Sequence, residues 1–492
     1  MMHETGESYT PVVAVKPPNN AGGATPPAAG AVEPRGVPEW NPQRDLKRRA
    51  QLRASLQEKL ARIRQVAERD HTVRFTTLWH HVYNLDRLAE TFFALRKDGA
   101  VGVDDVDWAS YDRDLAVNLQ DLASRLRRGA YHANLVRRVY IPKADGRLRP
   151  LGIITLEDKL VQRVVSDVLT VIYEAEFHDC SYGFRPGRGQ HDALDQLTVA
   201  LEHEKVNWVL DVDIRGFFDS IDHAWLIKFV EHRIADTRVI RHLKKWLKAG
   251  VLENGTVQIP EAGTPQGGSI SPLLANIYLH YALDNWAACW QRDCARGYVK
   301  LIRYADDVVV CFQYRSDADR FLREARERLA RFHLELHPEK TRLLEFGRFA
   351  DQNRRDRGDK PPETFNFLGF THICSTTLNE RFCVRRISQR TKVQAKLKEL
   401  SRDLRRRISE PLPQVGKWLG QVLRGHYRYY GVPRNLPALH CFREVVVKLW
   451  KKTLGRRSQK GYVTWERMNR LARKWLPVPT VMHPYPNQRV TV

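Results

Sequence analysis

The chain has 492 residues, of which 42% are hydrophobic and 10% aromatic, so it can build a large buried core and about three domains. These values exclude a wholly disordered chain. No apolar run reaches about 18 residues, so we expect no transmembrane helix. Seven cysteines without a CxxC pair, behind an N-terminus without a basic-then-apolar signal, indicate reduced thiols in a cytoplasmic protein. We therefore expect no membrane partner and no cysteine-rich zinc site.

The net charge of +24 lies almost entirely near the C-terminus. Residues 381–492 carry 27 Lys and Arg against 5 Asp and Glu, whereas residues 1–380 carry 54 against 52. Aromatic residues such as Trp418 and Tyr430 are interleaved with these cations. Because cations bind phosphates and aromatic rings stack on bases, this region predicts a nucleic-acid-binding surface. The alternative is a solvated, lysine-rich helical surface.

Composition divides the chain in order. Residues 1–43 are rich in Pro, Gly and Ala and predict a disordered tail. Residues 44–98 have helical spacing of leucines, and residues 100–380 mix helical periods with short β-branched runs, which is an α+β pattern. Within that part, the polar residues 350–363 predict a surface loop. After about residue 385 the strand signals stop and amphipathic helices follow.

Two adjacent acids, Asp306 and Asp307, stand between apolar runs in 303-RYADDVVVCF-312. Two apolar runs around a polar tip predict a β-hairpin with the acids at its turn. Neighbouring carboxylates repel each other when they lose water, and a divalent cation removes that cost. The alternative is an ordinary Asp-rich turn without a bound ion.

A second acidic strand strengthens the metal hypothesis. The run VLDVD places Asp211 and Asp213 on one face of a strand, because side chains alternate. If that strand lies beside the hairpin, Asp213 and Asp306 can hold two Mg²⁺ ions through carboxylate oxygens, with Asp307 as a supporting ligand or charge. For Asp211, and for Asp219 and Asp222 that follow, we favour strand-end and helix-cap roles.

Several segments together resemble the group II intron reverse transcriptases. Asp213 with Phe218 and the run YADD are similar to a reverse transcriptase palm. The other similar segments lie in the family's order across roughly residues 70–480: 140-YIPKADGRLRPLGI-153 (fingers), 181-SYGFRPGRGQHDAL-194, 263-GTPQGGSISPLLANIYLHYALD-284, 367-FLGF-370 (before the thumb) and 421-QVLRGHYRYYG-431 (the maturase, or X, domain).

The resemblance implies roles for five further residues. Lys143 and Arg149 match the positions that grip the incoming triphosphate, and Gln266 would lie near the template–nucleotide pair. Arg185 would contact template or nucleotide, although a buried structural arginine is the alternative. Phe218 would lie beneath the sugar, where its ring would clash with a 2′-hydroxyl, so we expect dNTPs rather than rNTPs as substrates.

The implied fold is a right-hand polymerase of the α+β class, with a small antiparallel palm sheet followed by an all-α thumb and maturase domain. We expect N-terminal helices and fingers over 44–200, palm over 201–380, thumb and X domain over 385–435, and a basic DNA-binding tail over 436–492. The seven cations expected to form an RNA-contact surface are Arg405, Arg406, Arg407, Lys417, Arg424, Arg428 and Lys448.

The implied activity is that of an RNA-directed DNA polymerase using two Mg²⁺ ions, dNTPs, a DNA target as primer and its own intron RNA as template. The protein would also assist splicing of that RNA and reverse-transcribe it during retrohoming, at the bacterial nucleoid. We expect the endonuclease domain of some relatives to be missing, and the oligomeric state, a homodimer included, stays open. Two alternatives remain: a domesticated reverse transcriptase serving host defence, CRISPR adaptation or repair, and a splicing-only maturase.

Overall fold

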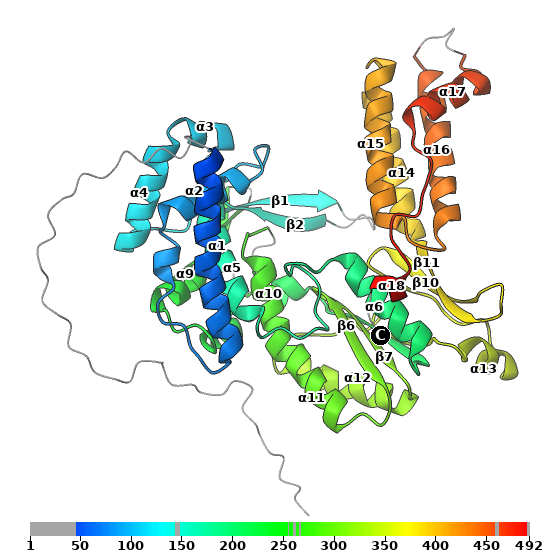
Figure 1. The fold of residues 1–492 in the computed structure, drawn as a ribbon, viewed down its shortest axis with the longest axis horizontal. Coiled ribbons are helices and arrows are strands. Elements are labelled where there is room, and N and C mark those ends of the chain that lie inside the picture. Colours follow the sequence, from blue (N-terminus) through cyan, green and yellow to red (C-terminus); the bar gives the residue numbers. More distant parts are fainter. Residues whose placement is uncertain are drawn as a thin grey trace, which may run out of the picture.

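The computed structural model describes residues 46–142, 148–253, 255–258, 262–264, 267–457 and 462–489 (Figure 1). The chain forms an N-terminal block of helices, a central block around a β-sheet, and a tall C-terminal helical module beside it. Among the helices that these ranges contain, none combines the length and the apolar character of a membrane span.

The N-terminal block consists of helices and a β-hairpin. Three of its helices follow residues whose side chains cap them: Asn84, Asp107 and Thr155 each accept a backbone N–H of the first turn. Its elements are α1 (Leu46–Arg69), α2 (Leu85–Ala94), α3 (Trp108–Arg113), α4 (Leu115–Arg128), β1 (Val136–Pro142), β2 (Leu148–Ile153) and α5 (Leu156–Tyr173). Strands β1 and β2 form a hairpin that extends toward the C-terminal module (Figure 1). The hairpin joins β4 (Val251–Glu253) and β5 (Thr256–Gln258) in a sheet of order β2-β1-β4-β5.

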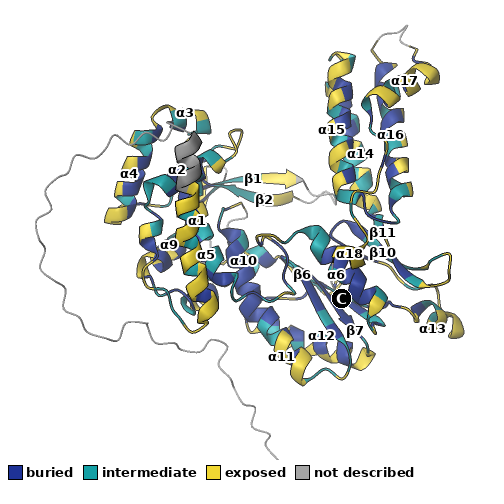
Figure 2. Cartoon of the chain, in the orientation of Figure 1, coloured by how far each residue is buried: buried dark blue, intermediate teal, exposed yellow. Residues whose placement is uncertain are grey.

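The central block is built on the predicted small antiparallel palm sheet. Its strand order is β6-β7-β3-β8, with β3 (Trp208–Asp213), β6 (Val299–Tyr304), β7 (Asp307–Phe312) and β8 (Arg342–Glu345). Runs rich in β-branched residues form β3 and β7, as the sequence predicted, and Figure 2 shows β6 and β7 buried along most of their length.

The two faces of this sheet pack against different cores. Leu210, Val308 and Val310 face a large core shared with the N-terminal block. The helices on that side are α8 (His223–Glu231), α9 (Thr237–Leu247), α10 (Ser271–Leu279), the π-helix His280–Asp284, α11 (Asn285–Asp293) and α12 (Arg315–Ala330). Val209 and Val309 face a second core, which is completed by α6 (Gln190–His203) and by the sheet of β9 (Phe365–Phe367), β10 (Phe370–Thr376) and β11 (Phe382–Ser388).

One predicted loop is wrong in part. Residues 350–363 contain helix α13 (Ala350–Asp356), which the polar sequence concealed. Its single buried residue is Ala350, so the apolar periodicity that normally marks a helix is absent. An Asp351–Arg355 ion pair one turn apart supports the helix instead.

The C-terminal helices form one module rather than two. Leu400 and Leu404 lie in the amphipathic helices predicted after residue 385. Both are buried, and they share a core with Leu419, Val446 and Met468. The module comprises α14 (Arg390–Arg406), α15 (Leu412–Tyr430), α16 (Leu436–Leu454) and α17 (Trp465–Trp475). The predicted domain boundary at residue 435 therefore falls inside a single packed unit, because helices on both sides of that residue share one core.

The chain then returns to the central block through residues 477–489, which we call the C-terminal strap. Its Met482 N–H donates to the carbonyl of Gly431 at 2.7 Å, at the end of α15. Its last helix, α18 (Pro486–Arg489), lies on α6 (Figure 1). There Arg489 pairs with Asp192 and Asp195, and Asp195 also binds the buried Arg386 of β11 at 2.7 Å.

Candidate active site

The acidic turn lies where the sequence predicted it, at the tip of the β6–β7 hairpin. Tyr304 pairs with Asp307, which leaves Ala305 and Asp306 as the turn. Ala305 has φ +56°, a left-handed conformation that costs free energy for a residue with a side chain. The structure around the turn must supply the energy that keeps it there.

Arg303 supplies much of that support. Its side chain is 0% exposed and donates to both carboxylate oxygens of Asp284 at 2.5 and 2.8 Å. The remaining nitrogen donates to Asn276 Oδ1 at 2.9 Å and to the Ala305 carbonyl at 3.0 Å. Asp284 ends a π-helical turn, a distortion often found near functional sites.

The strand that carries Asp213 lies beside this hairpin. Asp213 is the last residue of β3 and stands directly opposite Asp307, the first residue of β7, in an antiparallel pair. Residues so paired have Cα atoms about 4.5–5.5 Å apart and point to the same face. Asp213 therefore meets Asp306 and Asp307, which are distant from it in sequence, at one end of the palm sheet. Asp211 lies on the same face of β3, two residues before Asp213.

Burial raises the pKa values of Asp211, Asp306 and Asp307, and the neighbouring carboxylates add to this effect. Loss of water around the carboxyl, followed by the charge of Asp306, raises the pKa of Asp307 to about 6, although part of the side chain reaches solvent. Loss of water also raises the pKa of Asp306, with a further contribution from Asp213. Burial likewise raises the pKa of Asp211 to about 6, opposed by Arg342. Binding of a cation would therefore be favourable at this site.

Cations from three parts of the chain face the acids. Lys340, in the turn before β8, binds Asp213 Oδ2 at 2.8 Å. Arg149 of β2 is close enough to lower the pKa of Asp306, and Lys392 of α14 lowers that of Asp307. The fingers hairpin and the C-terminal module therefore both reach the acidic end of the palm sheet.

The donor set suits a hard divalent cation, since Asp213, Asp306 and Asp307 offer only carboxylate oxygens. Loss of water, with a further contribution from neighbouring carboxylates, raises the pKa values of Asp306 and Asp307, and a bound cation would favour their charged forms. In the described part of the chain, no three Asp, Glu, His or Cys side chains are already gathered into a metal-binding group. The Asp213 carboxylate is turned to Lys340, so ion binding would exchange that ammonium for a metal.

Comparison with known proteins identifies the family. Residues 141–372 match the model "Reverse transcriptase (RNA-dependent DNA polymerase)". Protein YkfC of Escherichia coli K12 is 37% identical over 277 residues, 50% of this chain and 72% of that protein. The group II intron-encoded protein LtrA of Lactococcus lactis is 45% identical over 163 residues, 33% of this chain and 27% of LtrA. The putative COX1/OXI3 intron 1 protein of Saccharomyces cerevisiae is 34% identical over 183 residues, 37% of this chain and 22% of that protein.

The chain belongs to the group II intron reverse transcriptase/maturase family. The resemblance read from the sequence is thereby confirmed, as is the α+β polymerase fold. The matches to LtrA and to the yeast intron protein span about a quarter of the length of those proteins.

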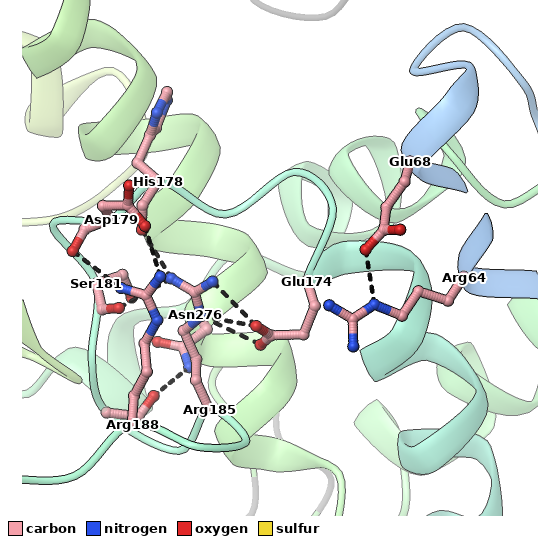
Figure 3. A network of polar contacts seen from close by, with 10 residues as sticks. Arg64, Glu68, Glu174, His178, Asp179, Ser181, Arg185, Arg188 and Asn276 are labelled. Atoms are coloured by element: carbon pink, nitrogen blue, oxygen red, sulfur yellow. Dashed lines mark hydrogen bonds and ion pairs between the residues drawn. The ribbon is translucent and has the colours of Figure 1, made fainter. Parts of the chain in front are cut away.

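Within this reverse transcriptase, Arg185 takes the structural role that the sequence left as the alternative. It is 7% exposed, and its guanidinium grips the carboxylate of Glu174 at 3.0–3.1 Å (Figure 3). The remaining nitrogen donates to the carbonyls of His178 and Ser181 at 2.7 and 2.9 Å. With each nitrogen engaged and buried, the expected contact of Arg185 with template or nucleotide is corrected to a support of its own loop.

The neighbouring residues Phe217 and Phe218 have different environments. Phe217 is buried in the palm core, whereas Phe218 is half-buried and remains partly accessible. The Phe218 carbonyl accepts the Thr264 N–H at 2.8 Å, and a Cβ at Gly263 would come within 2.9 Å of that carbonyl. Gly263, at φ +88°, thus allows a close backbone approach that a side chain would block.

The remaining expectations have mixed outcomes. Arg149 lowers the pKa of Asp306, and Lys143 and Gln266 lie outside the described residues. The sequence did not indicate the contact of Lys340 with Asp213. A lysine in a polar turn carries no periodic or motif signal, and Asp213 lies far from it in sequence. The only available clue was the position of 337-HPEKT-341 just before a strand of the palm.

Proposed function

We propose that this reverse transcriptase copies RNA into DNA at Asp213, Asp306 and Asp307, and that the same chain binds a group II intron RNA and assists its splicing. Family membership supports reverse transcription and maturase roles in general terms. The observation that carries the catalytic part is the pairing of Asp213 with Asp307 across β3 and β7, next to the Asp306 turn.

Asp213 and Asp306 would hold two Mg²⁺ ions, with Asp307 as a supporting ligand or charge. Such ions activate a primer 3′-hydroxyl and stabilise the leaving pyrophosphate. Arg149 would neutralise the triphosphate of the dNTP, because charge-assisted bonds to phosphate are strongest where water is scarce. Phe218 would close the space beneath the sugar and exclude the 2′-hydroxyl. Lys340 would hold Asp213 in place while the metal site is empty.

The C-terminal module would bind the RNA. Between α14 and α15 lies a hollow of about 1170 Å³, which opens next to Lys392 and hence beside Asp307. Its polar lining is mainly basic, with Glu399 as the acid, and it includes aromatic side chains. Among its lining residues are Lys396, Lys398, Arg402, Arg405, His426, Tyr429 and Tyr430. Phosphates and stacked nucleotides are the ligands such a lining favours.

The test is Mg²⁺-dependent primer extension on poly(rA)/oligo(dT), together with binding of the intron RNA. Asp306→Asn should abolish extension while RNA affinity stays within a few-fold of wild type. Asp359→Asn, which alters an exposed acid paired with Arg357, is the matched control and should extend normally. RNA binding and splicing without any extension by the wild type would overturn the polymerase assignment and leave a splicing-only maturase.

A further inference from the structure

Phe184 is an exposed aromatic residue with a strained backbone. Its side chain and backbone together are 57% exposed, and its φ is +58°. A bulky residue rarely adopts this left-handed conformation, since a glycine would do so at much lower cost. Exposure alone has little meaning, because isolated apolar residues are common on protein surfaces. Strain and exposure at one residue, however, are typical of functional positions.

The loop around Phe184 is anchored without any help from the phenyl ring. Before it, the Tyr182 N–H donates to the Arg303 carbonyl at 2.8 Å. The Gly183 carbonyl accepts from Asn276 Nδ2 at 2.7 Å. After it, Arg185 is locked by Glu174 and by two carbonyls (Figure 3). These bonds hold the backbone of Phe184 in its strained conformation and direct the ring outward.

The loop also touches the acidic turn directly. A Cβ at Gly183 would come within 2.4 Å of the Ala305 nitrogen, so only glycine permits this approach. The ring centroid of Phe184 lies 6.4 Å from that of Tyr304, the residue before the turn. An exposed ring thus stands beside the site where the primer end must lie if Asp306 is catalytic.

We propose that Phe184 is a nucleic-acid contact, whose ring packs against a nucleotide of the template–primer duplex next to the reacting pair. This inference rests on the proposed polymerase function. An aromatic ring offers a nucleotide a sequence-independent contact, which suits an enzyme that must accept every base pair in turn. The sequence predicted that Arg185 of this loop contacts the substrate. In this proposal its neighbour Phe184 makes that contact instead.

Three variants of Phe184 separate binding from folding. Affinity for an RNA–DNA primer–template duplex, measured by fluorescence anisotropy, should fall about fivefold or more in Phe184→Ala and Phe184→Gly. Phe184→Tyr retains the ring and should bind like wild type. The melting temperature of Phe184→Gly should be unchanged or higher, because glycine relieves the backbone strain. A ring with a purely structural role would instead lower it.

The matched control is Phe349→Ala. Phe349 is also 57% exposed but follows β8 at the end of the palm sheet opposite to the acids, so its loss should leave duplex affinity unchanged. If Phe184→Gly binds the duplex like wild type while wild type extends primers, this assignment is overturned and the proposed function stands. It is also overturned if melting temperature and affinity fall together. A wild type that does not extend primers overturns the proposed function itself.

Discussion

Arg303→Met should be among the most destabilising substitutions in the palm. Arg303 and Asp284 both have side chains that are 0% exposed, and the arginine makes four hydrogen bonds to Asp284, Asn276 and the Ala305 carbonyl. Methionine fills similar space but leaves the Asp284 carboxylate buried without its counter-charge. Removing one partner of a buried ion pair typically costs about 3–5 kcal/mol. We expect the free energy of unfolding to fall by that amount.

The measurement is urea denaturation of the full chain, followed by tryptophan fluorescence. Arg292→Met is the control, because its ion pair with Asp293 is exposed to solvent and should contribute little to stability. Loss of the bond to Ala305 should also release the strained turn, so primer extension should fall in conditions where the variant remains folded. If Arg303→Met costs no more than Arg292→Met, the reasoning about the buried pair is wrong.

Four further predictions concern the acids, the sugar and the phosphates. Because the pKa of Asp307 is raised to about 6, protons compete with Mg²⁺ for this carboxylate as the pH falls through 6. The Mg²⁺ concentration for half-maximal extension should therefore be higher at pH 5.5 than at pH 7.5. Equal concentrations at the two pH values would contradict this prediction. The same raised pKa means that, without a divalent cation, stability falls as pH rises from about 4 through 6, and adding Mg²⁺ at pH 7 should raise the melting temperature. Phe218→Ala should allow rNTP incorporation, measured against dNTP in single-nucleotide extension; unchanged selectivity would refute the steric role. Lys398→Ala combined with Arg402→Ala removes two exposed cations of α14, so the slope of log affinity for RNA against log salt should decrease by about 1.4–1.8; an unchanged slope would remove α14 from the RNA surface.

Much of the palm could be predicted because its signals are local. The hairpin of Asp306 and Asp307 follows from two apolar runs around a polar tip, and the shared face of Asp211 and Asp213 follows from strand alternation. Neither segment alone shows that β3 and β7 are neighbours. That expectation came from the resemblance, and the register of β3 and β7 now shows it.

The errors arise where a residue's role depends on distant partners. Arg185 has the same sequence context whether it faces a nucleotide or Glu174, and only the fold decides between them. Lys340 meets Asp213 across more than a hundred residues of chain. Helix α13 escaped prediction because it is surface helix without an apolar face, and residue 435 was chosen as a boundary because composition does not reveal a shared core.

The C-terminal strap adds an attachment between the C-terminal helical module and the central block, besides the bond of Arg434 to Glu202. The chain enters the helical module from Ser388 at the end of β11 and is secured again where Arg489 meets Asp192 and Asp195 on α6. Movement of the module away from α6 would first have to break the ion pairs of Arg489 with Asp192 and Asp195.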